Sequence, residues 1–534
     1  MDKQGTTAQQ GDVGHHKAGR LGWAGLLAGA LGGVIAAAVL FAVAELIATF
    51  FRPPASPLTS VGSTFIDFTP PWLKNLAIAT FGTNDKTVLL ISLVLAVTVL
   101  AALSGIVARR HLRVGLGMVL VFALVMAACV ITRAGAGVVD LIPLLIGTAA
   151  GLWTLRYLSR AGAKSTLESP EPAHQTPGLN RRAFLVRAAA LAGVVVVLGV
   201  AGNALMSVRN TAIAVRNALK LPAPKITAPP LPAGVQAPVP GVTPFLTPDA
   251  DFYRIDTALI VPEIDPSSWS LRVHGMVENE FTMGFDELLN AGLTEKYVTL
   301  TCVSNVVGGN LAGNAKWLGY PLREVMARAK PTPGADMVLS TSIDGFSAST
   351  PLPVLQDDRG AMLAIGMNGE PLPLEHGFPV RMVVPGLYGF VSATKWVVDL
   401  EVTTFAQKTG YWTTRGWSSH GPIKTASRVE VPSALARIPA GRVPIGGSAW
   451  AQTVGISKVE IQLDGGAWRL AQLAAEASVD TWRQWYYIWE NAQPGTHNVR
   501  VRAYNATGVL QTEQQAPPEP NGSTGWHSIT FTVL

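Results

Sequence analysis

The first two hundred residues contain five long apolar runs, each close to the roughly 20 residues that a helix needs to cross a bilayer. These runs cover residues 21–44, 87–108, 114–132, 135–155 and 188–207. No histidine lies within them, which argues against a membrane haem with paired axial ligands. The pattern therefore predicts a cytoplasmic tail over residues 1–20 and a five-helix transmembrane anchor over residues 21–207.

After residue 208 the pattern changes to proline-rich and then to short alternating segments. Residues 208–245 are expected to form a Pro-rich spacer with polyproline character. Short strands broken by Gly, Pro and Asp, with a few short helices, predict a mixed α+β domain over residues 246–425. Residues 426–534 carry mainly alternating strand signals and predict an immunoglobulin-like β-sandwich. The aromatic stretch TWRQWYYIWE at 481–490 fits either its core or an interface.

Basic residues lie mainly beside the apolar runs. These basic residues gather in the loops on one side of the predicted membrane spans. Because positive loops stay inside, the N-terminus is expected in the cytoplasm, and five crossings then place everything after residue 208 outside it. The protein is therefore expected in the cell membrane as a multi-pass protein with an extracytoplasmic C-terminal half. The net charge of +6 is modest, and the basic residues do not gather on one face of a predicted folded domain. A nucleic-acid partner is therefore not expected. The basic residues expected on the cytoplasmic side are Arg109, Arg110, Arg113, Arg156, Arg160, Lys164, Arg181, Arg182 and Arg187.

The last apolar run follows the stretch NRRAFLVRAA at residues 180–189. An arginine pair before an apolar helix is often only a positively charged flank. Here the following Phe184-Leu185 and the mild hydrophobicity of the run resemble a twin-arginine (Tat) export signal, although it is internal. Such export carries folded proteins, so the C-terminal half would fold in the cytoplasm before crossing.

The chain has two cysteines, and only Cys302 lies outside the apolar runs. It ends a run of β-forming residues in TLTCVSNVVGGN, residues 299–310. A lone thiol is most often a small buried hydrophobe. It could also be a nucleophile with a nearby base such as His376, or a soft metal ligand. Cys302 alone leaves these three possibilities open.

Two longer stretches resemble the sulfite oxidase family of molybdenum enzymes. TLTCVSNVVGGNLAGNAKWLGYPLREVM (299–326) is similar to the family's cysteine segment. MNGEPLPLEHGFPVRMVVPGLYGFVSATKW (367–396) matches its second signature, with His-Gly-Phe-Pro, Arg, Val-Pro-Gly and Lys-Trp in order. DFYRIDTALIVPEIDPSSWSLRVHGMV (251–277) resembles its first pterin-binding stretch. The resemblance covers about residues 250–534.

This resemblance implies a mononuclear molybdenum held by molybdopterin and by one protein thiolate. Cys302 matches the metal ligand. The resemblance also implies that residues 426–534 are the family's dimerisation domain, so a homodimer is expected. The remaining positions that match or fit cofactor contacts are Arg254, Asp256, Asn305, Asp344, His376, Arg381, Ser392 and Lys395.

The sequence departs from the family where the substrate would bind. Sulfite oxidases carry arginines just after the motif cysteine, whereas this chain has Val306 and Val307. In the later aromatic segment Trp417 lies near the position of the family's substrate tyrosine, with Arg415 before it. Because a doubly charged anion needs a cluster of guanidinium groups, sulfite is not the expected substrate. Trp417 and Arg415 are the candidate catalytic residues beside Cys302.

The implied function is a two-electron oxygen-atom transfer on a small molecule. No second redox centre is visible in the sequence, so a separate electron carrier, a cytochrome or a quinone-linked protein, is expected. Two alternatives remain at this stage. One is a cysteine hydrolase using Cys302 with His376 or His420. The other is a non-enzymatic membrane-anchored assembly or adhesion protein that uses the sandwich and its aromatic stretch.

Overall fold

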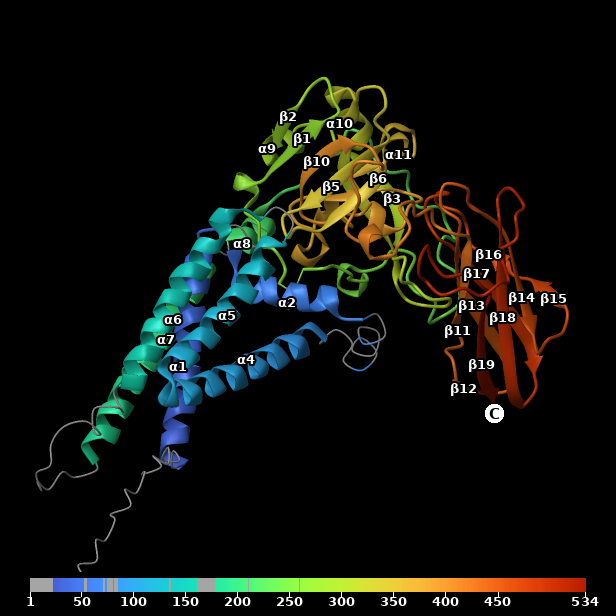
Figure 1. Cartoon of the computed structure of the whole chain (residues 1–534). Helices are drawn as coiled ribbons and strands as arrows, with labels where there is room; N and C mark the ends of the chain where they lie inside the picture. Colours follow the sequence, from blue (N-terminus) through green and yellow to red (C-terminus); the bar gives the residue numbers. More distant parts are fainter. Residues whose placement is uncertain are drawn as a thin grey trace, which may run out of the picture. The chain divides into compact units, whose positions relative to one another are not determined.

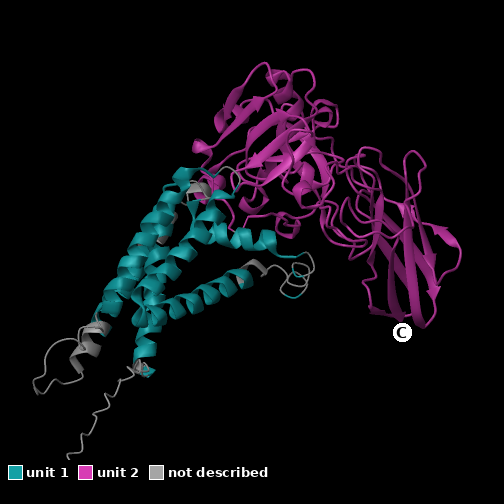
Figure 2. Ribbon diagram, viewed as in Figure 1, with its two compact units in different colours: residues 1–203 teal, residues 204–534 magenta. Residues whose placement is uncertain are grey.

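The computed structural model describes residues 23–51, 55–70, 73, 80, 85–133, 136–160, 178–209, 211–258 and 260–534. The expected tail 1–20 lies outside these residues. The chain divides into two compact units, residues 1–203 and 204–534, which Figure 2 colours separately. Each is described by itself below.

The first unit is helical (Figure 1). Four of the five predicted spans are confirmed as helices long and apolar enough to cross a membrane, at Gly25–Ala48, Val88–Arg110, Leu112–Ile131 and Val138–Arg160. The apolar part of α7 is shorter, Leu185–Val200. The helices are α1 (Trp23–Ala48), α2 (Pro57–Phe68), α4 (Asp85–Arg110), α5 (Leu112–Ile131), η3 (Val138–Leu141), α6 (Ile142–Arg160) and α7 (Gly178–Arg209).

Helix α1 is the centre of this unit because small residues let its neighbours approach closely. A Cβ atom added at Gly33 would lie 2.0 Å from the carbonyl oxygen of Ala101 on α4. One added at Gly147 of α6 would lie 2.6 Å from the carbonyl oxygen of Leu40. Such small-residue crossings are how helices associate where lipid removes the hydrophobic drive. Glu45, near the end of α1, accepts hydrogen bonds from Ser56 Oγ and the Leu58 amide at the start of α2.

The second unit begins with α8 and a segment that does not act as a free spacer. Arg216 of α8 donates to the carbonyl oxygens of Leu372 and Pro371. The following residues 219–248, here called the strap, run along two folded regions and hydrogen-bond to both. The Lys225 amide donates to Leu293 O at 2.7 Å, and the Ala237 amide donates to Gln484 Oε1 at 2.7 Å. The structure therefore differs from the expected spacer in this segment, because alternating apolar side chains of the strap are buried.

The mixed domain (residues 246–425) contains two five-stranded sheets. One has the order β2-β1-β10-β5-β6; the other has the order β3-β4-β7-β8, with β9 paired to β7. The strands are β1 (Ser270–Gly275), β2 (Phe281–Gly284), β3 (Thr294–Thr301), β4 (Ala312–Pro321), β5 (Met337–Ser342), β6 (Ser347–Pro351), β7 (Met362–Met367), β8 (Glu370–Pro371), β9 (Arg381–Val383) and β10 (Val397–Thr403). The helices are α8 (Thr211–Ala218) before the strap, then η4 (Asp249–Asp251), η5 (Pro266–Ser268), α9 (Phe285–Leu289), α10 (Leu322–Ala329), α11 (Leu352–Gln356), η6 (Leu374–His376), η7 (Gly389–Val391) and η8 (Thr413–Arg415).

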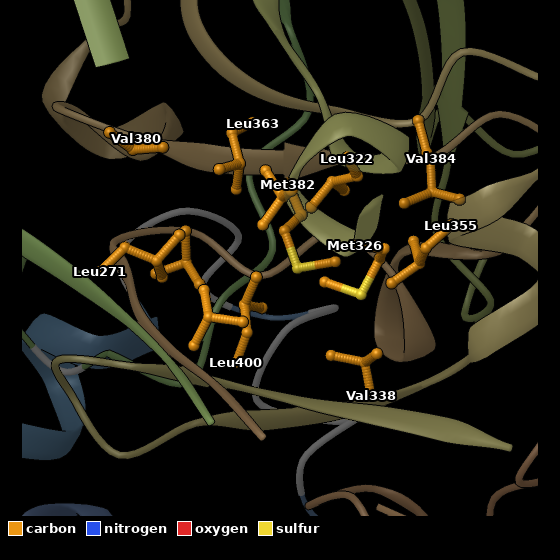
Figure 3. Close-up of a cluster of buried hydrophobic side chains, with 14 of the residues drawn as sticks. Leu271, Leu322, Met326, Val338, Leu355, Leu363, Val380, Met382, Val384 and Leu400 are labelled. Atoms are coloured by element: carbon orange, nitrogen blue, oxygen red, sulfur yellow. The ribbon is translucent and has the colours of Figure 1, made fainter. Parts of the chain in front are cut away.

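The two sheets of the mixed domain share an apolar core, shown in Figure 3. Leu271, Val338 and Leu400 come from one sheet, and Leu363 comes from the other. Met326 projects between them from α10. Fully burying side chains of this kind contributes about 1.5–3 kcal/mol each, so this core fixes the sheets on which the candidate site is built.

The two-sheet domain (residues 426–534) consists of a four-stranded sheet, β11-β13-β17-β16, and a five-stranded sheet, β12-β19-β18-β14-β15. Both contribute to one apolar cluster. The aromatic stretch serves both roles that the sequence allowed: Trp485 lies in this interior, whereas Trp482 packs with Phe245 and Ala312 outside it. The strands are β11 (Ala426–Val431), β12 (Arg437–Ile438), β13 (Gly441–Trp450), β14 (Ile456–Leu463), β15 (Trp468–Leu470), β16 (Gln472–Leu473), β17 (Arg483–Ala492), β18 (Gly495–Asn505) and β19 (His527–Val533).

Candidate cofactor site

A cavity in the mixed domain brings together residues from distant parts of the chain. Cys302 directly follows β3, His376 ends η6, and Arg381 begins β9. Asp344 lies in the β5–β6 turn, and Lys395 lies in the connection to β10. The polar and charged lining residues are Tyr253, Asp256, Thr257, Cys302, Ser304, Ser342, Asp344, His376, Arg381 and Lys395.

Cys302 is buried, with 8 % of its surface exposed. Burial raises the pKa of its thiol, although the Ser304 amide, which donates to Sγ at 3.4 Å, opposes this. No hydrogen bond among the described residues joins Cys302 to His376 or His420. The thiol is therefore held in its neutral form by its surroundings and has no base beside it.

Arg381 is a buried guanidinium in the cavity wall. It donates to the carbonyl oxygens of His376 and Met382 and lies over the Trp317 ring, 5.1 Å from the centroid. Burial lowers its pKa to about 10, while Tyr253 raises it. Within the described part of the chain it forms no ion pair with a carboxylate. A buried charge without a counter-ion is costly, so this position favours an anionic ligand.

Lys395 is the second cation of the wall. Its Nζ donates to Asp256 Oδ2 at 2.7 Å and to the carbonyl oxygen of Glu375 at 2.9 Å. Burial lowers its pKa to about 8, against the opposing effect of Asp256. Arg254 also pairs with Asp256, at 3.0 Å, from the exposed side.

His376 and Asp344 are two further titratable members of the wall. Burial, with Arg381 and Lys395 adding to it, lowers the pKa of His376 to about 4, so its imidazole is neutral at pH 7. The His376 Nε2 atom lies 3.1 Å from the carbonyl oxygen of Asp249. Burial raises the pKa of Asp344, whose carboxylate accepts from the Phe346 amide at 3.1 Å. The wall thus offers both cationic and neutral polar groups.

Four predicted residues do not line this cavity. Asn305 Oδ1 accepts from the Leu311 amide and closes its own loop. Ser392 Oγ donates to the carbonyl oxygen of Tyr388 and is fully buried. Arg254 is exposed and pairs with Asp256, and Arg415 lies over the Tyr411 ring, 3.6 Å from its centroid. Their short-range partners explain these positions.

The mouth of the cavity is aromatic. Trp417 and Trp412 line it, and Trp417 packs against Phe390 with ring centroids 5.9 Å apart. Val306, which stands where sulfite oxidases carry an arginine, lines a second cavity. Phe346 and Ile255 complete the apolar rim.

Comparison with known proteins gives three findings. Residues 258–412 match the model of the oxidoreductase molybdopterin binding domain. The chain is 28% identical over 288 residues to mitochondrial sulfite oxidase of Macaca fascicularis, covering 45% of this chain and 52% of that protein. It is 28% identical over 335 residues to sulfite oxidase of Gallus gallus, covering 53% and 72%.

The chain is thus similar to the sulfite oxidase family of molybdopterin-dependent oxidoreductases, and residues 258–412 carry the molybdopterin binding domain. It spans about half the length of the first of these relatives. Over 195 residues it is 33% identical to nitrate reductase [NADH] 1 of Oryza sativa subsp. japonica, covering 32% of this chain and 21% of that protein. The sulfane dehydrogenase SoxCD structure from Paracoccus pantotrophus aligns with a TM-score of 0.48 at 22% identity, covering 54% of this chain and 83% of that chain.

Molybdopterin is accordingly the cofactor of this sulfite oxidase family domain. The residues present fit it, because a buried thiol and a buried guanidinium face one cavity, and the part of the chain that the structure describes gives this guanidinium no carboxylate partner. A phosphate-bearing pterin would supply the anionic partner for the Arg381 guanidinium.

Tyr253 was missed by the sequence reasoning. It is buried next to Arg254, and burial together with nearby Cys302 raises the pKa of its hydroxyl. The signal was present, since Tyr253 directly precedes Arg254 in the stretch that resembles the family's first pterin-binding segment. Phe346 and Phe390 were also missed, because nothing in the sequence shows which aromatic side chains of a loop turn inward.

Proposed function

We propose that the protein is a membrane-anchored, extracytoplasmic molybdenum oxidoreductase that transfers an oxygen atom to or from a small neutral molecule, and not sulfite. One observation carries the proposal: the Cys302 thiol faces the same buried cavity as the Arg381 guanidinium, which pairs with no carboxylate of the described residues. When bound, the molybdenum cofactor supplies the two-electron oxygen-atom transfer chemistry.

Each wall residue has a distinct role in this proposal. Cys302 Sγ is the protein ligand of the metal. Arg381 and Lys395 bind the anionic part of the cofactor through charge-assisted hydrogen bonds. His376 is neutral at pH 7 and its Nε2 donates to the carbonyl oxygen of Asp249, so Nδ1 is left to accept one hydrogen bond from the pterin without adding charge. Asp256 orients Lys395 through their 2.7 Å contact.

The aromatic mouth supports a neutral substrate. Trp412, Trp417 and Phe390 exclude water and provide apolar contact, but no cation. Arg415 donates to the carbonyl oxygen of Tyr411 at 2.8 Å and does not line the cavity. An anion would need guanidinium groups at this point. A sulfoxide, an N-oxide or a similar uncharged molecule suits the mouth better than sulfite or nitrate.

The first unit supports the proposed topology. Gly33 of α1 lies against Ala101 of α4, and Gly147 of α6 lies against Leu40, so α4 and α6 both run antiparallel to α1. The basic ends of α4 and α6 therefore fall at the same end of the bundle as the start of α1. Positive charge at one end is the cytoplasmic signature.

We propose α7 as the fifth membrane helix and as the carrier of the twin-arginine signal. Ala188 of α7 joins an apolar cluster with Ile35 of α1 and Leu158 of α6. Valines on another face of α7 are exposed, as expected for contact with lipid; among them are Val194, Val196, Val197 and Val200. Five crossings place residues after 209 outside the cytoplasm.

The remaining partners belong to the same proposal. A separate carrier, a cytochrome or a quinone-linked protein, exchanges electrons with the enzyme, because its sequence shows no motif for a second redox centre. The two-sheet domain is proposed as an immunoglobulin-like dimerisation domain that joins two copies.

Elemental analysis tests the metal assignment. The full-length protein, purified in detergent from cells that make molybdopterin, is expected to contain close to one molybdenum per chain. Cys302→Ser should lose most of it, whereas Cys129→Ser, which changes the other thiol, should retain it. A wild-type protein with almost no molybdenum, or equal contents in both variants, would overturn the metal assignment.

Activity screening tests the substrate class. The loaded enzyme is assayed with sulfoxides, N-oxides and sulfite, using an artificial electron donor or acceptor. Turnover of the neutral compounds with little sulfite oxidation is expected. Efficient sulfite oxidation would refute the proposed neutral substrate while leaving the cofactor assignment intact.

Replacing Arg181 and Arg182 by lysine tests the export route. The variant should leave the C-terminal unit on the cytoplasmic face, which protease treatment of intact cells detects. Protease accessibility equal to that of the wild type would exclude the twin-arginine signal.

The hydrolase alternative is not favoured. A cysteine nucleophile needs a base within hydrogen-bond reach. In the described structure, His376 Nε2 faces the Asp249 carbonyl oxygen, and His420 pairs with Ser419 outside the cavity. The adhesion alternative loses its main support because Trp482 and Trp485 are buried.

A further inference from the structure

Residues 302–311, here called the cysteine loop, form a closed loop between β3 and β4. The Cys302 amide donates to the carbonyl oxygen of Leu311 at 2.9 Å, which closes the loop at its base. The Asn305 amide donates to the carbonyl oxygen of Cys302 at 3.1 Å, and Asn305 Oδ1 accepts from the Leu311 amide at 2.9 Å. Any shift of residues 305–309 therefore reaches the backbone of Cys302 directly.

The outer side of the cysteine loop is held by the two-sheet domain. Ser523 Oγ donates to the carbonyl oxygen of Asn305 at 2.6 Å. Arg428 Nη1 donates to the carbonyl oxygen of Gly309 at 2.9 Å. Arg428 is itself buried and fixed by Glu430 at 2.7 Å, so it is a rigid donor.

A third contact limits the position of the loop by shape. Gly308 has φ +77°, and a Cβ atom added there would lie 2.1 Å from His527 Nε2. The His527 ring is fixed in turn, since its Nδ1 accepts from the Val429 amide at 3.0 Å. The loop can approach the two-sheet domain this closely only because residue 308 has no side chain.

Behind the loop the packing is incomplete. A second cavity of about 20 Å³, against about 110 Å³ for the first, lies between the loop and the two-sheet domain. Thr301, the residue before Cys302, lines it with a buried hydroxyl that has no hydrogen-bond partner among the described residues. Since packing does not support the loop on this side, its polar contacts must do so.

We propose that the two-sheet domain positions the metal ligand, with Ser523 and Arg428 as positioning residues for Cys302 and His527 as a steric stop. This inference rests on the proposed function, in which Cys302 ligates molybdenum. A functional ligand has to be held within about 0.5 Å of its productive place by its supporting contacts. The two-sheet domain thus takes part in the site without lining the cavity.

The test compares two serines in the same domain. Ser523 Oγ and Ser457 Oγ each donate to a backbone carbonyl oxygen at 2.6 Å, but Ser457 bonds to Asn505, within the two-sheet domain. Ser523→Ala is the test variant and Ser457→Ala is the matched control. Gly308→Ala pushes the loop away from His527 of the same domain.

The first readout is the alkylation rate of Cys302 in cofactor-free protein, in a Cys129→Ala background. Loss of one hydrogen bond that holds the loop closed should raise the rate about five-fold in Ser523→Ala. Ser457→Ala should match the parent protein. Equal rates in the two serine variants, with Gly308→Ala also unchanged, would overturn the inference.

The second readout is the electron paramagnetic resonance spectrum of the half-reduced, molybdenum-loaded full-length protein. Altered or broadened signals are expected for Ser523→Ala and Gly308→Ala, and the parent spectrum for Ser457→Ala. Spectra identical to the parent in both loop variants would refute the positioning role. Failure of the parent protein itself to bind molybdenum would instead refute the proposed function.

Discussion

The mixed domain has two interiors that differ in what completes them. The apolar core shown in Figure 3 is filled by side chains of the protein alone. Leu271, Leu363 and Leu400 are fully buried in it. The cofactor cavity of the same domain buries Arg381 and Lys395. Among the described residues, Lys395 has a carboxylate partner and Arg381 has none. The core therefore specifies the fold, whereas the cavity specifies a ligand.

The difference also shows how the domain distributes stability. Apolar burial stabilises the fold in every state, but a buried unpaired guanidinium costs free energy until an anion is bound. The cofactor-free protein should thus be less stable than its core suggests, and cofactor binding should recover the difference.

The largest expected effect comes from the core. Leu363→Ala removes buried methyl groups and leaves a cavity, so it should destabilise the protein by about 2–5 kcal/mol. The loss should be the same with and without cofactor, which thermal denaturation of both forms measures. A loss seen only in the cofactor-free form would mean that the core and the cavity are not separable.

The next effect has opposite signs for two buried arginines. Arg381 and Arg428 are each 5% exposed, but of the two only Arg428 pairs with a carboxylate among the residues that the structure describes. Arg381→Met should raise the stability of the cofactor-free protein by about 1 kcal/mol or more, since it removes an uncompensated charge. Arg428→Met should lower it by about 3 kcal/mol, since the largely buried Glu430 carboxylate loses the cation that pairs with it.

Molybdenum content completes the arginine comparison. Arg381→Met should lose cofactor despite its greater stability, which separates binding from folding. Destabilisation of the cofactor-free protein by Arg381→Met would show that the guanidinium serves the fold.

The smallest expected effect is a pH dependence. Burial lowers the pKa of Lys395 from 10.5 to about 8 in the cofactor-free protein. As pH rises through about 8 the folded protein loses this charge, so anion binding should weaken while the cofactor-free fold gains stability up to the unfolded value of 10.5. Lys395→Arg keeps its charge and should remove both trends, as cofactor retention and denaturation across this pH range would measure. Persistence of the trends in the arginine variant would assign them to another group.

Long apolar runs and the order of motif residues were readable from the sequence. Four spans were placed within a few residues because apolar length alone defines them. The sequence also picked out Cys302, His376, Arg381 and Lys395, which the fold brings to one cavity. Their types suit an anionic, sulfur-bound cofactor, so chemistry and position agree.

Other positions could not be read because local partners decide them. Asn305 and Ser392 are polar residues inside the motifs, yet each satisfies a nearby backbone group instead of the cavity. Arg254 and Tyr253 are neighbours in an extended segment, where one step along the chain reverses the side that a residue faces. Sequence spacing cannot fix that step.

The strap has a practical consequence for anyone who wishes to separate the catalytic part from its anchor. A fragment that starts at residue 246, where the motifs suggest a boundary, would lack the amides of Lys225 and Ala237 that bind two different folded regions. It would also expose the apolar surfaces that Val235 and Val239 cover. A water-soluble fragment should instead begin ahead of α8, near residue 211, so that this stretch of chain is kept whole.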